Sequence, residues 1–330
     1  MGEARSMPQL VIVSPALRDA NNGNWQTARR WQRHLAGDYV VRIVKQWPSA
    51  LACDDVAMIA LHARRSAESI AAWSKQHPDR GLAVVLTGTD LYRDIAVDAS
   101  AQHSLLLAQK LVVLQEAAPE VLAADLRRKC RVIYQSTTPR KPLAKPTRRL
   151  RAVMVGHLRE EKSPETLFAA ARLLKAHGDI HIDHIGDPLD PALGRAAQDT
   201  MRAAPNYRWL GGLSHEETRR RIQRAHLLIH CSRMEGGAHV IMEAAACGTP
   251  VLASDITGNV GMLGADYAGY FPWGDAAALA ALILRCRNAD GTDTLRQTLQ
   301  RQCAKRAPLF APEVEKAALH KLVRELLGRR

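Results

Sequence analysis

The residues most suited to chemistry lie in one stretch, residues 231–254, where two glutamates flank a pair of glycines at the start of an expected helix. Gly236 and Gly237 let the backbone approach a ligand, and the free N–H groups that begin a helix favour an anion such as a diphosphate. Glu235 is expected in the loop, and Glu243, within the first turns of the helix, is able to accept hydrogen bonds from a diol. The alternative is an ordinary strand-to-helix turn with solvated glutamates.

These residues need a scaffold, and the sequence predicts alternating strands and helices. Runs rich in β-branched residues are expected as strands at 9–13, 40–44, 56–61, 82–86, 110–114, 131–134, 151–155, 180–185, 207–210, 226–231 and 251–254. Helical patterns occur at 25–35, 66–75, 164–176, 216–224, 240–247, 275–287 and 312–327. This alternation predicts an α/β protein with parallel sheets, which bind ligands at the carboxyl ends of their strands.

A proline-rich segment separates the two halves of the chain. Pro139, Pro142 and Pro146 each fix φ and lack an N–H donor, so no regular element is expected to continue through them. We therefore expect an N-terminal Rossmann-like domain, a basic Pro-rich linker, a C-terminal Rossmann-like domain and a terminal helix. Their bounds are 1–138, 139–150, 151–311 and 312–330.

The formal charge of +13 is concentrated in a short segment. Residues 1–136 hold 17 basic and 13 acidic residues, residues 152–330 hold 23 and 20, and residues 137–151 hold six basic residues and no acidic ones. No RNP-like, zinc-finger or helix-turn-helix signature accompanies the charge, so a nucleic-acid partner is not expected. We interpret the basic run as a solvated linker, the alternative being a segment that faces phosphate or nucleic acid.

Composition excludes several classes of protein. The longest apolar run, residues 276–284, has nine residues, whereas a membrane-spanning helix needs about 20. The apolar run 10–13 is too short for the core of a signal peptide. The six cysteines are spread without a Cys-x-x-Cys pair, which argues against a disulfide frame or zinc site and for a reducing cytoplasm. No carboxylate cluster has metal-ligand spacing, so no structural metal is expected.

Glu235 and Glu243, separated by seven residues and followed by AAACGTPV, resemble the C-terminal signature of retaining nucleotide-sugar glycosyltransferases with the GT-B fold. The similarity spans about 150–285, and VGHLREEK (155–162) resembles the phosphate loop of that family. The resemblance implies two Rossmann-like domains facing each other across a cleft, with the last helix crossing back to the N-terminal domain. It implies no required cofactor, with assistance by Mg²⁺ left open.

The resemblance also implies roles for single residues. Lys162 would neutralise the donor diphosphate, which is the main electrostatic task of such a transfer. Glu243 would hold the ribose. Glu235, Gly236 and Gly237 would face the sugar, and Ala238 would also be part of the donor site. Glu235 and Lys162 would be the catalytic residues. The family's loop arginine falls on His157, which is only partly protonated near neutrality, and whether His157 or Arg159 takes its place is open.

Acceptor-side candidates of the N-terminal half lie at the ends of expected strands. They are Gly23, Asn24, His62, Arg64, Thr87, Gly88, Asp90 and Arg93. Many relatives carry a histidine where this chain has Thr87. A hydroxyl acceptor benefits from a nearby base, whereas an acceptor that is anionic at pH 7 needs none. Each residue also has a structural alternative, which is a plain turn for Gly23, a strand cap for His62 and solvated charge for the arginines.

Five segments together resemble the selenosugar synthases of selenoneine biosynthesis. They are NNGNWQTARRW, ALHARRSA, LTGTDLYRDI, MEGGAHVIMEA and DITGNVGMLGADYAGYF. This resemblance implies transfer of N-acetylglucosamine, or a related hexose, from a UDP-sugar to selenophosphate, with release of UDP and phosphate. A selenophosphate synthetase is then the expected supplier. The anionic acceptor would need positively charged groups near it. Arg18, Arg64, Arg65 and Arg93 lie at strand ends and in loops of the N-terminal half, where they would supply this charge.

Two alternatives stay open at this point. One is a GT-B hexosyltransferase that acts on an ordinary hydroxyl acceptor, such as a glycan or a lipid. The other is a non-catalytic glycosyltransferase fold that binds nucleotide or RNA. The sugar, the anomeric outcome and the oligomeric state are not determined by these residues.

Overall fold

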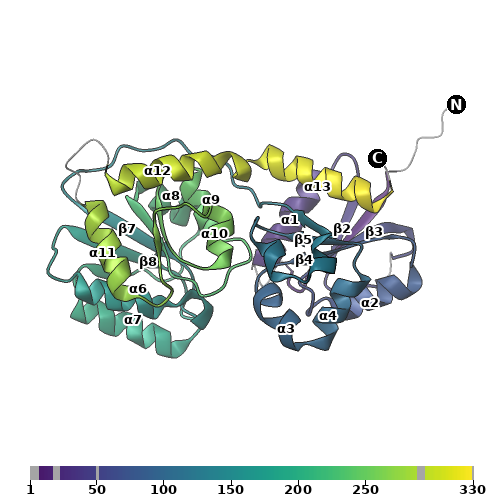
Figure 1. Ribbon diagram of the computed structural model, residues 1–330, viewed down its shortest axis with the longest axis horizontal. Coiled ribbons are helices and arrows are strands. Elements are labelled where there is room, and N and C mark those ends of the chain that lie inside the picture. The colour runs from purple at the N-terminus through teal and green to yellow at the C-terminus, as the bar shows by residue number, and fades with distance from the viewer. Residues whose placement is uncertain (1–6, 18–22, 50–51, 288–293, 329–330) are drawn as a thin grey trace. The chain divides into compact units, whose positions relative to one another are not determined.

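The computed structural model describes residues 7–17, 23–49, 52–287 and 294–328. The chain divides into two compact units, each with its own sheet (Figure 1). Unit 1 comprises Met1–Gln135 and Pro312–Arg330, and unit 2 comprises Ser136–Ala311. The expected α/β fold with two Rossmann-like sheets is confirmed. Arg18, one of the expected acceptor cations, lies outside the described residues.

The described part of unit 1 contains a six-stranded parallel sheet in the order β2-β1-β3-β4-β5-β6. The strands are β1 (Gln9–Val13), β2 (Val40–Val44), β3 (Asp55–Leu61), β4 (Gly81–Leu86), β5 (Lys110–Val113) and β6 (Cys130–Val132). The larger helices are α1 (Gly23–Leu35), α2 (Ala67–Gln76), α4 (Ala99–Leu107) and α13 (Pro312–Leu326), and the short α3 (Ile95–Val97), α5 (Ala124–Arg127) and η3 (Asp90–Asp94) join them.

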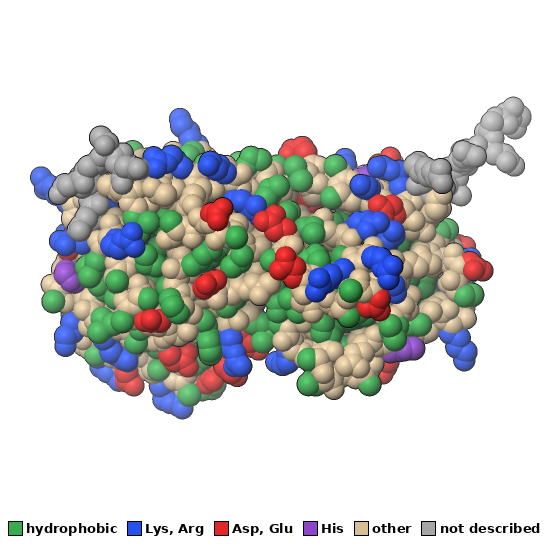
Figure 2. All heavy atoms as spheres, in the orientation of Figure 1, with side chains coloured by type: hydrophobic (Ala, Val, Ile, Leu, Met, Phe, Trp, Pro, Cys, Tyr) green, Lys and Arg blue, Asp and Glu red, His purple; other side chains and the backbone are tan. Residues whose placement is uncertain are grey.

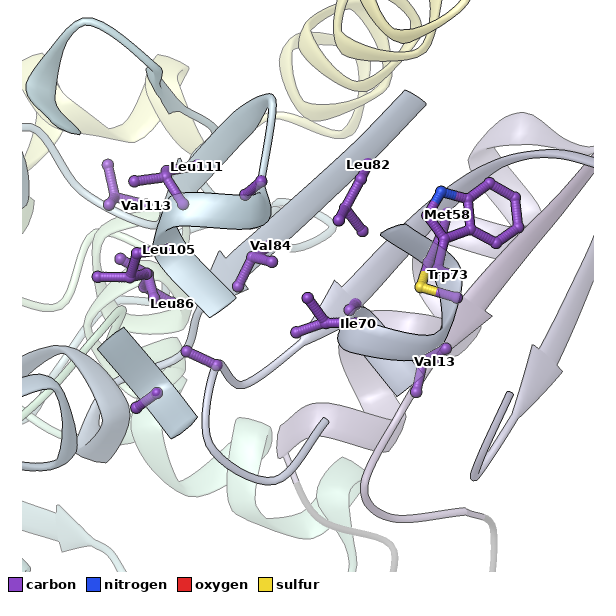
Figure 3. Packing of buried hydrophobic residues seen from close by; sticks show 14 of the residues in the cluster. Val13, Met58, Ile70, Trp73, Leu82, Val84, Leu86, Leu105, Leu111 and Val113 are labelled. Carbon is purple, nitrogen blue, oxygen red and sulfur yellow. The ribbon is translucent and has the colours of Figure 1, made fainter. Parts of the chain in front are cut away.

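Alternate residues of each unit 1 strand point into two separate cores. Val11 and Val13 of β1 belong to the core that contains Trp73 of α2, part of which is drawn in Figure 3. Leu10 and Ile12 belong to the other core, with Trp31 of α1. Because both faces are covered, the strands read as nearly continuous apolar runs.

The terminal helix α13 is fastened to unit 1 by a buried carboxylate and by close packing. Arg30 donates from Nε to Glu315 Oε2 at 2.8 Å, and Trp31 donates from Nε1 to Glu315 Oε1 at 2.7 Å. At the other end of α13, a Cβ on Gly81 would lie 2.5 Å from the carbonyl oxygen of Leu326. Only glycine therefore fits at the start of β4.

The described part of unit 2 contains a second six-stranded parallel sheet, in the order β12-β11-β10-β7-β8-β9. The strands are β7 (Leu150–Val155), β8 (Ile180–Ile185), β9 (Tyr207–Trp209), β10 (Leu227–His230), β11 (Val251–Ser254) and β12 (Tyr270–Phe271). The helices are α6 (Pro164–Leu173), α7 (Pro191–Ala203), α8 (His215–Arg224), α9 (His239–Ala245), α10 (Thr257–Leu263), α11 (Ala276–Arg287) and α12 (Leu295–Arg306).

The proline-rich segment 136–148 has no helix or strand, but it lies along unit 2. Arg140 N donates to Ala246 O at 3.0 Å, and Gln223 Nε2 donates to Lys141 O at 2.8 Å. These hydrogen bonds satisfy main-chain N–H and C=O groups that are not paired within a helix or a β-sheet. The segment therefore follows the surface of unit 2, while most of its side chains between 138 and 149 are exposed to solvent, as the charge pattern suggested.

The surface carries both signs of charge. Figure 2 shows Lys and Arg side chains interspersed with Asp and Glu on the face that is drawn. Within the described residues, no helix combines the length and apolarity needed to cross a membrane. The thiols of Cys130, Cys231, Cys247, Cys286 and Cys303 are free.

Candidate active site

Lys162 and Glu235 meet at the carboxyl edge of the unit 2 sheet. β7 and β10 are neighbours in that sheet, so the loops that follow them lie side by side. Lys162 lies in the loop after β7, and Glu235 lies in the loop after β10. Lys162 Nζ donates to Glu235 Oε1, and the two side chains are only 17% and 13% exposed.

Glu235 is held as an anion by its neighbours. Burial raises the pKa of Glu235, but the Lys162 ammonium and the hydrogen bond with His230 together outweigh burial and hold this pKa well below the usual range. Ser232 Oγ donates to Glu235 Oε1 at 2.7 Å. His230 Nε2 lies 3.4 Å from the same oxygen, and burial keeps the pKa of His230 low. The site thus holds an ionised carboxylate beside a neutral imidazole.

Two glycines let the loops approach closely. A Cβ on Gly258, in the first turn of α10, would lie 2.1 Å from the carbonyl oxygen of Glu235. A Cβ on Gly156 would lie 3.4 Å from the side chain of Lys162. Ser163, directly after Lys162, has φ of +45°, a left-handed conformation that costs free energy in a residue with a side chain. The backbone around the ion pair is therefore closely constrained.

Glu243 lies on α9 among basic groups from two helices. His215, the first residue of α8, places Nε2 2.7 Å from Glu243 Oε1. His239 Nδ1 and Arg219 Nε lie 3.7 and 4.0 Å from the same oxygen. Burial raises the pKa of Glu243, but the hydrogen bonds from His215 and His239 outweigh it and lower the pKa to about 2. Glu243 is ionised, although its side chain is only 4% exposed.

His157 is a neutral hydrogen-bonding group. The N–H of Asp187 donates to His157 Nδ1 at 3.0 Å, which leaves the proton of the neutral ring on Nε2. Burial lowers the pKa of His157, although the Asp187 carboxylate opposes it. Arg159 is about half-exposed, with Nε 3.8 Å from Glu161 Oε2. The fixed positive charge in the loop after β7 thus comes from Arg159 and Lys162.

The remaining donor-side candidates precede α9. Gly236, Gly237 and Ala238 form the turn that leads into this helix, and Ala238 is its N-cap residue. Across the turn, the Arg233 guanidinium lies 5.3 Å from the ring centroid of Trp273. Trp273 is about half-exposed and donates from Nε1 to Ser163 Oγ at 2.9 Å. An aromatic surface therefore stands beside the loop that carries Lys162.

In unit 1, Asp90 organises the loop after β4. Its Oδ1 accepts from Thr87 N at 2.8 Å and Gly88 N at 2.9 Å, and its Oδ2 accepts from Ala63 N at 3.0 Å. Thr87 Oγ1 also lies 3.4 Å from Asp90 Oδ1. The carboxylate is buried and occupied by these donors, so its role is to position the loops after β3 and β4. Gly88 has φ of +139°, which glycine adopts without strain.

His62, directly after β3, is buried and has both ring nitrogens engaged. Arg65 N donates to Nδ1 at 3.3 Å, and Nε2 lies 3.2 Å from Thr89 Oγ1. Burial lowers the pKa of His62 against the opposing pull of Asp90. Its φ of +73° is uncommon for a residue with a side chain, and such strain clusters at functional sites.

Two arginines share one buried carboxylate beside His62. Arg64 Nε and Arg93 Nε each lie 3.1 Å from an oxygen of Asp94, which is 3% exposed. The two guanidinium side chains are 43% and 49% exposed. Arg64 and Arg93 thus bring two partly exposed guanidinium groups together at the carboxyl ends of β3 and β4, and such groups are suited to bind a small anion.

The sequence-predicted residues thus form three groups. Lys162 and Glu235 are in direct contact, Glu243 forms a separate centre, and the candidates at 62–93 gather at the carboxyl ends of β3 and β4. Gly23 and Asn24 are the first residues of α1, and Gly23 O accepts from Thr27 Oγ1 at 2.9 Å.

Sequence reasoning missed several partners of these residues. They are Asp94, His215, Arg219, His230, Ser232 and His239. His239 was detectable, because it precedes Glu243 by four residues on one helix. Among the described residues, no group of three or more His, Cys, Asp or Glu side chains is arranged to hold a metal ion.

A family model described as "Glycosyl transferases group 1" matches residues 135–307. A sucrose-phosphate synthase from Thermosynechococcus elongatus is similar in structure, with a TM-score of 0.75, 18% identity, and coverage of 98% of this chain and 99% of that one. Anabaena HepE in complex with UDP and glucose gives a TM-score of 0.73, 14% identity, and coverage of 96% and 99%.

A TarM structure from S. aureus, solved with fondaparinux, alpha-GlcNAc-glycerol and UDP, gives a TM-score of 0.62 at 15% identity. That alignment covers 82% of this chain, which spans 55% of the TarM chain. A search of curated protein sequences finds no significant match. At these identities, the structural likenesses establish the GT-B fold.

Proposed function

The chain belongs to the glycosyl transferases of group 1, and from this premise we propose that it transfers a hexose, N-acetylglucosamine in the first instance, from a UDP-sugar to selenophosphate. The UDP-sugar is supported by similar structures, since HepE was solved with UDP-glucose and TarM with UDP. Selenophosphate is supported by the sequence resemblance and by the cationic centre of Arg64 and Arg93.

Unit 2 is assigned the donor. Lys162, already neutralised by Glu235, would turn toward the diphosphate and stabilise the charge that develops as UDP leaves. Arg159 would add a second cation, and His157 would donate from Nε2 without adding charge. Glu243 Oε1 is engaged by His215, so a ribose hydroxyl would bind Oε2 or displace the exposed His215 ring.

The observation that carries the acceptor assignment is the pair of arginines on Asp94. A selenophosphate trianion or dianion would replace solvent at Arg64 and Arg93, while its selenium attacks the anomeric carbon. A C–Se bond would form as the C–O bond to UDP breaks. Water would then cleave the P–Se bond and release phosphate. No proton has to be removed from such a nucleophile.

The experiment is UDP release, measured with UDP-N-acetylglucosamine and selenophosphate, with the selenosugar identified by mass spectrometry. Arg64→Gln should raise the KM for selenophosphate at least about tenfold, which corresponds to one charge-assisted hydrogen bond. It should change the KM for the UDP-sugar by less than about twofold. Arg128→Gln, an exposed arginine of unit 1, is the matched control. Equal effects of Arg64→Gln on both KM values would remove the acceptor assignment.

A hydroxyl acceptor is the second candidate, and one distance favours it. His62 Nε2 lies 3.9 Å from Asp94 Oδ2, and to act as a general base this nitrogen would have to give up its contact with Thr89 Oγ1. His62→Asn tests this candidate, because asparagine tolerates a positive φ. A base would make kcat fall by about 10²–10⁴ in the variant. With an anionic acceptor, kcat should stay within about threefold.

A further inference from the structure

Unit 2 contains a cavity of about 590 Å³ at the amino ends of its strands. It is lined by the starts of β7 and β8, by β9 and by the end of α8. The ion pair of Lys162 and Glu235 lies at the opposite, carboxyl ends. A six-residue strand such as β8 separates the two by about 20 Å. The cavity therefore has no role in the chemistry proposed above.

The sheet face that lines the cavity is charged. Parallel sheets are usually covered by helices on both faces, which makes their strands apolar throughout. β8 instead reads IHIDHI, and His181 and Asp183 share one face of it. Arg151 of β7 pairs in register with His181, and Arg208 of β9 pairs with Asp183.

The cavity has a large excess of positive charge. Asp183 accepts from Arg208 and from Arg221 of α8, each at 3.0 Å or less. Three more arginines line the same cavity, and the described residues offer them no ion pair; these are Arg149, Arg151 and Arg224. Because the guanidinium fork matches phosphate oxygens, such a cluster favours a phosphate group.

Two buried polar atoms at the cavity wall need a different kind of partner. Asn206 is only 7% exposed, and its Nδ2 donates to Ala171 O at 3.1 Å. Its Oδ1 and the Nε2 of His181 are buried and have no hydrogen-bond partner in the described structure. Buried polar atoms are normally paired. Since Asn206 Oδ1 accepts, its partner must be a donor such as a hydroxyl group.

We propose that this cavity binds a small phosphorylated molecule with free hydroxyl groups, of the sugar phosphate class. Its phosphate contacts Arg149, Arg151 and Arg224, and a shift of the Asn206 side chain would let a hydroxyl donate to the buried Oδ1. The volume lies within the range of about 300–1,000 Å³ that is typical of small-ligand sites. The site is independent of the donor and acceptor assignments.

The test is isothermal titration of the full chain with glucose 6-phosphate in phosphate-free buffer, with saturating UDP present to occupy a donor site. We expect a single saturable binding event. Inorganic phosphate should bind at least about tenfold more weakly, because it lacks the sugar ring and its hydroxyl groups. Arg151→Ser combined with Arg224→Ser should weaken glucose 6-phosphate at least about tenfold.

Arg220→Ser is the matched control, because Arg220 lies on α8 next to Arg221 but pairs with Glu216 outside the cavity. It should leave the affinity within about twofold, and an unchanged melting temperature of each variant shows that it is folded. Three results overturn the proposal. They are no saturable binding in the presence of UDP, equal affinity in the double variant, and arginine-dependent binding of RNA or anionic vesicles in place of glucose 6-phosphate.

Discussion

Replacing Lys162 by methionine would separate the structural and chemical roles of the Lys162–Glu235 pair. The change leaves the Glu235 carboxylate, whose side chain is 13% exposed, without its counterion. Breaking a buried pair from one side costs about 3–5 kcal/mol, and we expect about 3 kcal/mol here because both side chains keep some contact with water. Lys162→Met with Glu235→Gln removes both charges and should recover most of that stability.

Activity should not recover. A preorganised group that stabilises developing charge is worth about 2.7–4 kcal/mol, so Lys162→Met should lower kcat at least about 100-fold. The double variant lacks the same cation and should stay equally impaired. Lys175→Met, at an exposed position of unit 2, is the control and should match the wild type in both measurements.

The assays are urea unfolding at pH 7 and steady-state UDP release. The reasoning is refuted if the double variant regains both stability and activity, because the pair would then be structural only. It is also refuted if Lys162→Met unfolds like the wild type, because Glu235 would then be solvated and its pKa would not depend on Lys162.

Three further predictions concern other charged groups. Burial raises the pKa of Glu243, but hydrogen bonds such as that from His215 outweigh burial and lower this pKa to about 2. The ionised Glu243 carboxylate therefore stabilises the folded state above about pH 4.5, and this contribution is lost as the pH falls. When the pH is lowered from 5 to 2.5, the free energy of unfolding in urea should fall by about 2 kcal/mol more in the wild type than in Glu243→Gln. Burial lowers the pKa of Lys145 to about 8, so the unfolded chain binds more protons between pH 8 and 10 and stability rises with pH there. Lys145→Met should abolish that rise and add about 1 kcal/mol at pH 7, as measured by denaturant midpoints. Glu315→Gln removes the buried counterion of Arg30 and should cost unit 1 about 3 kcal/mol in urea unfolding, and a wild-type midpoint would contradict this.

Elements with a strong local signal were predictable from the sequence. β8 was expected at 180–185 and is observed over those residues, because the alternation of apolar and polar residues in IHIDHI fits an extended strand. α7 was not expected, although its buried residues Leu193, Ala197 and Thr200 recur at helical spacing. The start of α7 nevertheless has a signal in the sequence. Asp190 is the N-cap residue, whose side chain accepts from Ala192 N at 2.7 Å, and Pro191 occupies the first turn.

Residue types and spacing by themselves placed Glu235 and Glu243 in a strand–loop–helix segment and pointed to an anionic ligand. They also placed Lys162 in the loop after β7. Only the tertiary structure decided that Lys162 pairs with Glu235, because this depends on β7 and β10 being neighbours in the sheet. The sequence suggested that Asp90 lies on the acceptor side. In the structure its carboxylate accepts hydrogen bonds from three backbone N–H groups and so positions the loops after β3 and β4. The physical reason is that sheet order and burial, which set contacts and pKa values, arise from packing between segments far apart in the chain.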